Sequence, residues 1–141
     1  MASTQKQISV IYFEIQGSWF AVPLENVEGV ASIPEIVAVP GNASRVFVGV
    51  AYILGQIMSV VDCAPLFNLG NSDRKSQCLI VQLDKEYYGI MVHHVGKIVS
   101  DPPLKKIAQP ETGIAQTSFE HNDKKIILLD IHELIGRHVC N

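Results

Sequence analysis

A chain of 141 residues matches the length of one domain and is long enough to bury a core without disulfide or metal cross-links. Its formal net charge of -3 and its dispersed lysines and arginines argue against nucleic-acid binding, which requires clustered basic residues. The longest stretch without a charged residue, 46–61, is shorter than the about 20 apolar residues that span a membrane, so we expect no direct membrane insertion.

The cysteines and the N-terminus indicate a cytoplasmic protein. Cys63, Cys78 and Cys140 are odd in number and lack the spacings of a disulfide framework. The first residues lack the basic segment and apolar run of a signal peptide. We therefore expect the chain to act in a reducing compartment.

Pairs of short β-branched runs, separated by turn residues, predict β-hairpins along the chain. In chain order the paired runs are 8–15 with 19–24, 46–53 with 57–61, 78–83 with 87–92, and 113–119 with 125–129. The first turn is expected to be a three-residue loop, 16–18, that contains glycine. Strands of this length and spacing favour a barrel or a sandwich over alternating strands and helices.

An aspartate follows the last strand of each half and predicts a short helix there. Asp130 stands three residues before Glu133, a spacing typical of an N-cap with a reciprocal glutamate. Asp62 precedes Pro65, and proline is tolerated in a first helical turn. Both carboxylates are therefore expected to cap helices.

The two aspartates also reveal an internal repeat. Aligning them gives an offset of 130 − 62 = 68 residues, and apolar residues then meet apolar residues at nearly every position expected in the core. Examples of residues that meet under this shift are Phe20 with Tyr88, Val22 with Ile90, Val27 with Val95, and Val60 with Leu128. We interpret residues 1–141 as a single domain with repeat halves of about 8–70 and 76–138.

Candidate catalytic and metal-binding residues do not form a recognisable constellation. Asp62 and Asp130 hold equivalent capping positions, and Cys63 has no neighbouring base that would activate a thiol. His93 and His94 point to opposite faces of a strand, while the other histidines miss the spacing of paired ligands. Phosphate-binding glycine motifs are absent. We expect no enzyme activity, no metal and no cofactor.

The ordered set of motifs resembles the CheW family of chemosensory coupling proteins. The first half carries Phe20-Ala21-Val22-Pro23-Leu24 with Val27, then Val39-Pro40, the Gly55 turn and Val60-Val61-Asp62. The second half adds Gly89-Ile90 with Val92, Gly113-Ile114-Ala115, and Ile126-Ile127-Leu128-Leu129-Asp130 with Leu134. The resemblance extends from about residue 8 to about residue 136.

This resemblance implies an all-β fold of two pseudo-symmetric, five-stranded SH3-like barrel subdomains around a shared hydrophobic core. It also implies a non-catalytic adaptor that joins the cytoplasmic tip of chemoreceptors to the regulatory domain of the histidine kinase CheA, with possible recruitment to membrane receptor arrays. The alternatives are a CheW-like adaptor of another pathway, such as surface motility, and a β-barrel module that binds a peptide or ligand without a kinase.

The second hairpin departs from the family pattern L-R-G-x-h-x-P-V-h-D, where h is apolar. Leu54 replaces the arginine that the family uses in receptor contact, and Ser59 replaces the proline. We expect Leu54 to lie at a partner-binding surface, with Val27 as a groove residue and Val95 added by internal symmetry. The alternative is that Leu54 turns into the core, because side chains of a hairpin alternate between faces.

Overall fold

The computed structural model describes residues 7–33, 35–41, 44–69, 76–108 and 113–139. Most of these residues form strands, so the predicted all-β class is confirmed. The strands are β1 (Ser9–Ile15), β2 (Ser18–Pro23), β3 (Val27–Ser32), β4 (Phe47–Ile53), β5 (Gln56–Val61), β6 (Gln77–Leu83), β7 (Glu86–Val92), β8 (His94–Ser100), β9 (Lys105–Lys106), β10 (Ala115–His121) and β11 (Lys124–Leu129). The helical elements are the 3₁₀ turns Leu24–Asn26 and Ala64–Phe67 and the helix α1 (Ile131–His138).

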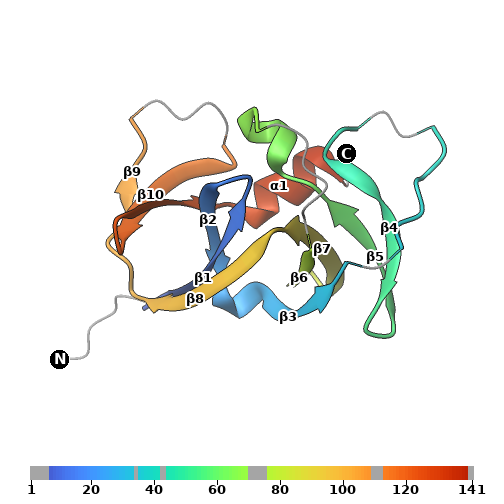
Figure 1. The fold of residues 1–141 in the computed structure, drawn as a ribbon, viewed down its shortest axis with the longest axis horizontal. Helices are drawn as coiled ribbons and strands as arrows, with labels where there is room; N and C mark the ends of the chain where they lie inside the picture. The colour runs from blue at the N-terminus through green and yellow to red at the C-terminus, as the bar shows by residue number, and fades with distance from the viewer. Residues whose placement is uncertain (1–6, 34, 42–43, 70–75, 109–112, 140–141) are drawn as a thin grey trace.

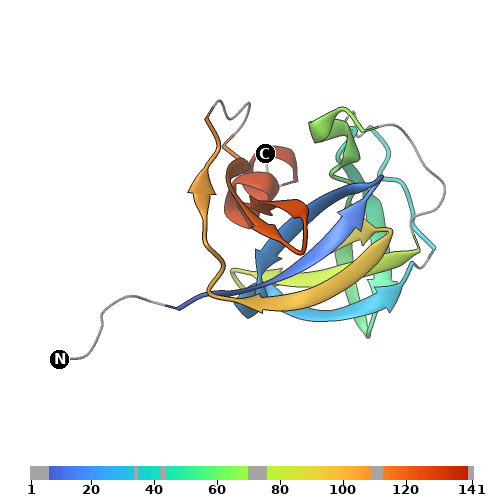
Figure 2. The same ribbon diagram turned by 60° about the vertical axis from the view of Figure 1, so that its left-hand side comes forward.

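The strands form two sheets that lie side by side along the long axis of the molecule, with α1 between them (Figure 1). One sheet has six strands in the order β8-β1-β2-β11-β10-β9, and the other has five in the order β3-β6-β7-β5-β4. Figure 2 shows β1 and β8 running together, with β9 and the β4–β5 hairpin on opposite sides of the molecule. The edge strand β9 and the β4–β5 hairpin are therefore far apart in the fold.

The strands repeat at the offset of 68 residues, but the two sheets are not the two halves of the sequence. The bounds of β1, β4 and β5 coincide with those of β6, β10 and β11 when 68 is added. The hairpin β1–β2 comes from the first half of the sequence but lies in the six-stranded sheet with β8 to β11 of the second half. The hairpin β6–β7 comes from the second half but lies in the five-stranded sheet with β3 to β5 of the first half. The parallel pairs β2 with β11 and β5 with β7 connect each exchanged hairpin to the other half.

Two details of the expected barrels need correction. The sheet that contains β1 and β2 has six strands rather than the expected five, because the two-residue strand β9 pairs with β10. Within the described residues, the two outer strands of each sheet also pair on one side only, so neither sheet closes into a hydrogen-bonded barrel. The shared core holds the two sheets together without closure.

Each hairpin turns through two residues, which corrects the expected three-residue loop at 16–18. Both turn residues have positive φ, the geometry of a type I′ turn, whose twist matches that of the flanking strands. The turn pairs are Gln16–Gly17, Leu54–Gly55, Asp84–Lys85 and Asn122–Asp123. The turn residues therefore occupy equivalent, left-handed conformations in every hairpin.

The main hydrophobic core is shared between the sheets, as predicted. Phe13 and Phe20 of the six-stranded sheet and Leu79 of the five-stranded sheet belong to one buried cluster. Helix α1 closes this core with Ile131, Leu134 and Ile135. Removing these side chains from water is the main contribution that holds the two sheets together.

Both predicted aspartate caps are present. The Asp130 side chain accepts a hydrogen bond from the Glu133 backbone N–H at 3.2 Å, and the Asp62 side chain accepts one from the Ala64 N–H at 3.0 Å. Glu133 does not complete the expected reciprocal bond; its carboxylate instead accepts from Arg137 Nε at 2.7 Å, one helical turn later. The aspartates therefore serve as structural caps.

Candidate protein-binding surface

The tip of the β4–β5 hairpin exposes large apolar side chains. Tyr52 and Leu54 are 67% and 70% exposed, and Ile57 is 77% exposed. Strand alternation places Tyr52 and Ile57 outward because Ala51, Ile53 and Met58 take the inward positions of the same strands. We call Tyr52, Leu54 and Ile57 the hairpin patch.

The hairpin patch continues into an apolar groove. Val37 is 60% exposed and pairs with Val50 of β4 through backbone hydrogen bonds of 2.8 and 2.9 Å. The groove has a volume of about 400 Å³ and is lined by Glu35, Val37, Val50, Ala51, Tyr52 and Ile57. A clustered, exposed apolar surface of this kind is typical of regions that bind other molecules.

Leu54 stands in the turn itself with φ 51°, followed by Gly55 with φ 80°. A left-handed conformation costs a residue with a Cβ atom about 1–2 kcal/mol, and the first positions of the other turns carry Gln, Asp or Asn instead. Burial of the Leu54 side chain does not offset this cost, because the side chain is exposed. Its Cδ1 atom lies near Gly29 of β3. The alternative that Leu54 turns into the core is therefore wrong.

The other two predicted site residues lie elsewhere. Val27 begins β3 and pairs with Val81, whereas Val95 lies on β8 of the other sheet and pairs with Phe13. Both are half-buried and pack against the main core. The structure thus places Val27 and Leu54 on one sheet, and Val95 on the other.

Sequence reasoning missed Tyr52, Ile57 and Val37. Their signal is present in the repeat: at the offset of 68 these apolar residues meet Glu120, Lys125 and Lys105. When one repeat half has an apolar residue where the other half has a charged one, the position is exposed in the fold. The apolar residue then has a role other than packing in the core. Alignment of apolar residues alone detects the core and passes over this contrast.

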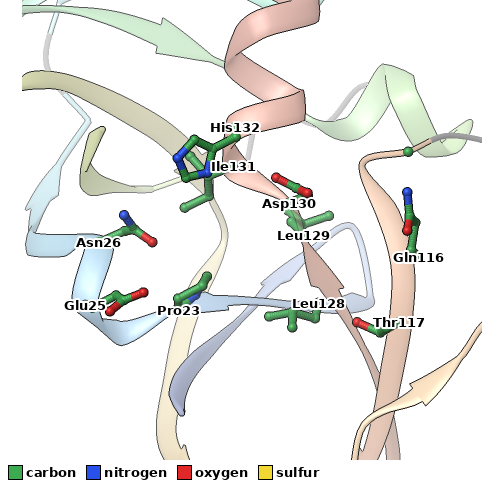
Figure 3. A pocket seen from close by; sticks show the side chains of 11 residues that line it. Pro23, Glu25, Asn26, Gln116, Thr117, Leu128, Leu129, Asp130, Ile131 and His132 are labelled. Atoms are coloured by element: carbon green, nitrogen blue, oxygen red, sulfur yellow. The ribbon is translucent and has the colours of Figure 1, made fainter. Parts of the chain in front are cut away.

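A second concave region lies where α1 begins (Figure 3). Its volume is about 350 Å³, and its lining includes Glu25, Asn26, Gln116, Asp130 and His132. The Asp130 carboxylate is occupied by the N-terminal cap of α1. This carboxylate therefore has a structural role at the start of α1.

The described cysteines are buried. Cys63 belongs to the main core, and burial raises the pKa of the Cys78 thiol to about 11. A thiol that keeps its proton is a poor nucleophile and a poor metal ligand. Cys140 lies outside the described residues.

The histidines are dispersed over the fold. The His93 ring joins the two sheets, because its Nδ1 accepts a hydrogen bond from the Gln16 backbone N–H at 2.8 Å, while His94 is exposed. In the described ranges, no three His, Cys, Asp or Glu side chains gather as a metal-binding group would. None of the helices in the described part of the chain has the length and apolar character needed to cross a bilayer.

Comparison with known proteins adds an independent observation. Residues 9–139 match the family model of the CheW-like domain. The chain is 29% identical to the chemotaxis protein CheW of Thermotoga maritima (strain ATCC 43589 / DSM 3109 / JCM 10099 / NBRC 100826 / MSB8) over 145 residues, covering 96% of this chain and 92% of that protein. Its fold is similar to the crystal structure of the scaffolding protein TtCheW from Thermoanaerobacter tengcongensis, with a TM-score of 0.76 and 17% identity, covering 89% of this chain and 90% of that one.

Proposed function

This chain belongs to the CheW-like domain family, and we propose that it is a non-catalytic adaptor that couples chemoreceptors to a CheA-type histidine kinase in chemotaxis. In this proposal it acts in the cytoplasm and joins receptor arrays by binding proteins. The hairpin patch is the observation that carries the proposal, since an adaptor needs exposed apolar residues held on a rigid scaffold.

Physical considerations support binding through a small number of residues. A micromolar contact requires a net free energy of about −8 kcal/mol, which a modest interface with a few anchor side chains supplies. Tyr52 and Ile57 are large side chains on paired strands, so little conformational freedom of the backbone is lost when a partner covers them.

Leu54, Val27 and Val95 are proposed partner-binding residues. Leu54 offers apolar contact where the family pattern has an arginine, so the bidentate hydrogen bonds of a guanidinium are replaced by burial of an isobutyl group. Val27 and Val95 are half-buried, and each presents only part of its side chain. We expect Leu54 to contribute more to binding than either valine.

The proposal is tested by calorimetric titration of the full chain with the regulatory domain of a CheA-type kinase and with a receptor hairpin fragment. We expect each partner to bind and a complex of all three to form. Absence of kinase binding at tens of micromolar would refute the kinase-coupling role.

A second titration tests Leu54 itself. Leu54→Arg and Leu54→Ala are expected to change the affinity for the receptor fragment, and Asn122→Ala at the equivalent turn of the other sheet is the control. Equal affinity of all variants would show that Leu54 takes no part in receptor binding.

A further inference from the structure

A groove at the opposite end of the molecule has a different chemical character. It has a volume of about 500 Å³ and lies beside β9, the last strand of the six-stranded sheet. Figure 1 shows β9 at one end of the long axis and the β4–β5 hairpin at the other. The residues that line the groove are Pro103, Lys105, Lys106, Ile107, Ala108, Ser118, Phe119, Glu120 and Lys125. We call this region the lysine groove.

The lysine groove is the repeat counterpart of the apolar groove. The backbone geometry is the same, because Lys105 pairs with Ser118 as Val37 pairs with Val50. At the offset of 68, the lining residues exchange Val37 for Lys105, Val50 for Ser118, Ala51 for Phe119, Tyr52 for Glu120, and Ile57 for Lys125. The fold therefore builds one concave surface twice, and the sequence gives the two copies different chemistry.

The lysine groove carries a net positive charge. Lys105, Lys106 and Lys125 are all exposed, and Glu120 is the one carboxylate in the lining. Glu120 is the direct cross-strand neighbour of Lys125, so the three lysines of the lining face one carboxylate. By contrast, the strands of the five-stranded sheet contain no lysine or arginine. Within the strands, lysines thus occur only in the six-stranded sheet.

The floor and edge of the groove suit an extended chain. The lining also includes Ser118, which is 9% exposed, and the half-buried Ile107, which adds an apolar part to the groove. In the part of the chain that the structure describes, β9 has a partner on one side only, so its outer edge can pair with the backbone of another strand. Alternate side chains of such a strand would lie on the face of the sheet that carries Lys105 and Lys125.

From these observations we propose that the lysine groove binds an extended, acidic segment of a partner protein along the edge of β9. Carboxylates on one face of the segment would neutralise Lys105 and Lys125, which share a face of the sheet, and its backbone would extend that sheet. A concave site with three lysines, two of them on the short edge strand β9, favours a single peptide over a flat anionic membrane or a nucleic-acid duplex. The inference goes beyond the proposed function, since it concerns a separate surface and does not require the hairpin patch.

The test is an amide NMR titration of the full chain with an octapeptide in which glutamate alternates with threonine. We expect shifts confined to β9, β10 and the start of β11, with weaker binding at high salt because the contact is electrostatic. Lys105→Glu with Lys125→Glu should weaken binding at least about tenfold, and the milder Lys105→Gln with Lys125→Gln should weaken it less. The matched control is Lys85→Glu with Lys97→Glu, which makes the same charge change at exposed lysines outside the groove and should leave binding within about twofold.

Three outcomes would overturn the proposal. The first is absence of binding to the wild-type chain, and the second is equal weakening by the groove and control variants, which would indicate only a general charge effect. The third is binding to phosphatidylglycerol vesicles without binding to the peptide, which would assign the lysines to a lipid surface. Because kinase and receptor binding are measured with other partners, failure here is distinct from failure of the adaptor role.

Discussion

Tyr52 and Ile57 face each other directly across the β4–β5 hairpin, and both side chains lie in solvent. The corresponding cross-strand pair of the other sheet is Glu120 with Lys125, a charged pair on an equally exposed hairpin. A folded hairpin therefore accepts charged residues at these positions. The apolar pair is therefore not needed to form the strands, and its exposure supports the partner contact proposed above.

Replacing Tyr52 and Ile57 together by threonine should separate binding from stability. Threonine favours strands, so the free energy of unfolding should fall by less than about 1 kcal/mol, the value of one cross-strand pair. Affinity for the protein partner that covers the hairpin should fall about tenfold or more, because two apolar anchors are lost. Urea unfolding and calorimetric titration measure the two effects, and a large loss of stability with unchanged affinity would contradict this assignment.

Leu54→Asn should stabilise the fold. Asparagine adopts the left-handed conformation more readily than leucine, and little buried contact is lost from a side chain that is 70% exposed. We expect the free energy of unfolding to rise by about 1 kcal/mol in urea denaturation. The reciprocal change Asn122→Leu at the equivalent turn should lower it by a similar amount, and a destabilised Leu54→Asn variant would refute the explanation.

Stability should depend on pH through Cys78. The unfolded chain loses this proton near the ordinary thiol pKa of 9.0, whereas the folded protein keeps it until about 11. The unfolded state therefore binds fewer protons in this interval, and stability that is fully present below about 9 is lost as the pH rises toward about 11. Urea denaturation at a series of alkaline pH values should show a shallower decline for Cys78→Ala, since the other titrating groups are common to both chains.

Two glycines should respond in opposite directions to alanine. A Cβ atom on Gly96 would overlap the ring of Tyr12, which is 5% exposed and packs edge-to-face on Trp19 at 5.4 Å between centroids. Gly96→Ala should cost about 1–3 kcal/mol of unfolding free energy. Gly136→Ala in α1 meets open space and should add about 0.5–1 kcal/mol, so a thermal or urea series with both variants provides its own control.

Neither half of the chain should fold alone. A fragment that ends before residue 76 lacks β6 and β7, which are the central strands of the five-stranded sheet, and the complementary fragment lacks β1 and β2. Circular dichroism should show no cooperative unfolding for either fragment. As a control, a full chain cut by protease at a site inserted between residues 70 and 75 should stay folded, with both pieces eluting together. Cooperative unfolding of a single half would contradict the exchanged arrangement.

Local patterns in the sequence predicted the hairpins, the buried strand residues and both capping aspartates, because these depend on residues close in the chain. The length of the first turn was predicted wrongly, since Gln16 and Gly17 suffice for a type I′ turn and Ser18 belongs to β2. The barrel expectation missed β9, because two adjacent lysines carry no strand pattern and pair only where β10 lies beside them. Of the candidate site, the sequence indicated Leu54 but neither Tyr52 nor Ile57.

The sequence by itself determined the repeat and the position of each apolar residue within it, because hydrophobic periodicity and turn chemistry act over a few residues. Only the tertiary structure decided which hairpin belongs to which sheet, since the parallel pairs β2 with β11 and β5 with β7 join segments far apart in the chain. It also decided that two equivalent grooves lie at opposite ends of the molecule, one apolar and one basic. Burial of a shared core fixes that arrangement, because each sheet is completed only by strands from the other half.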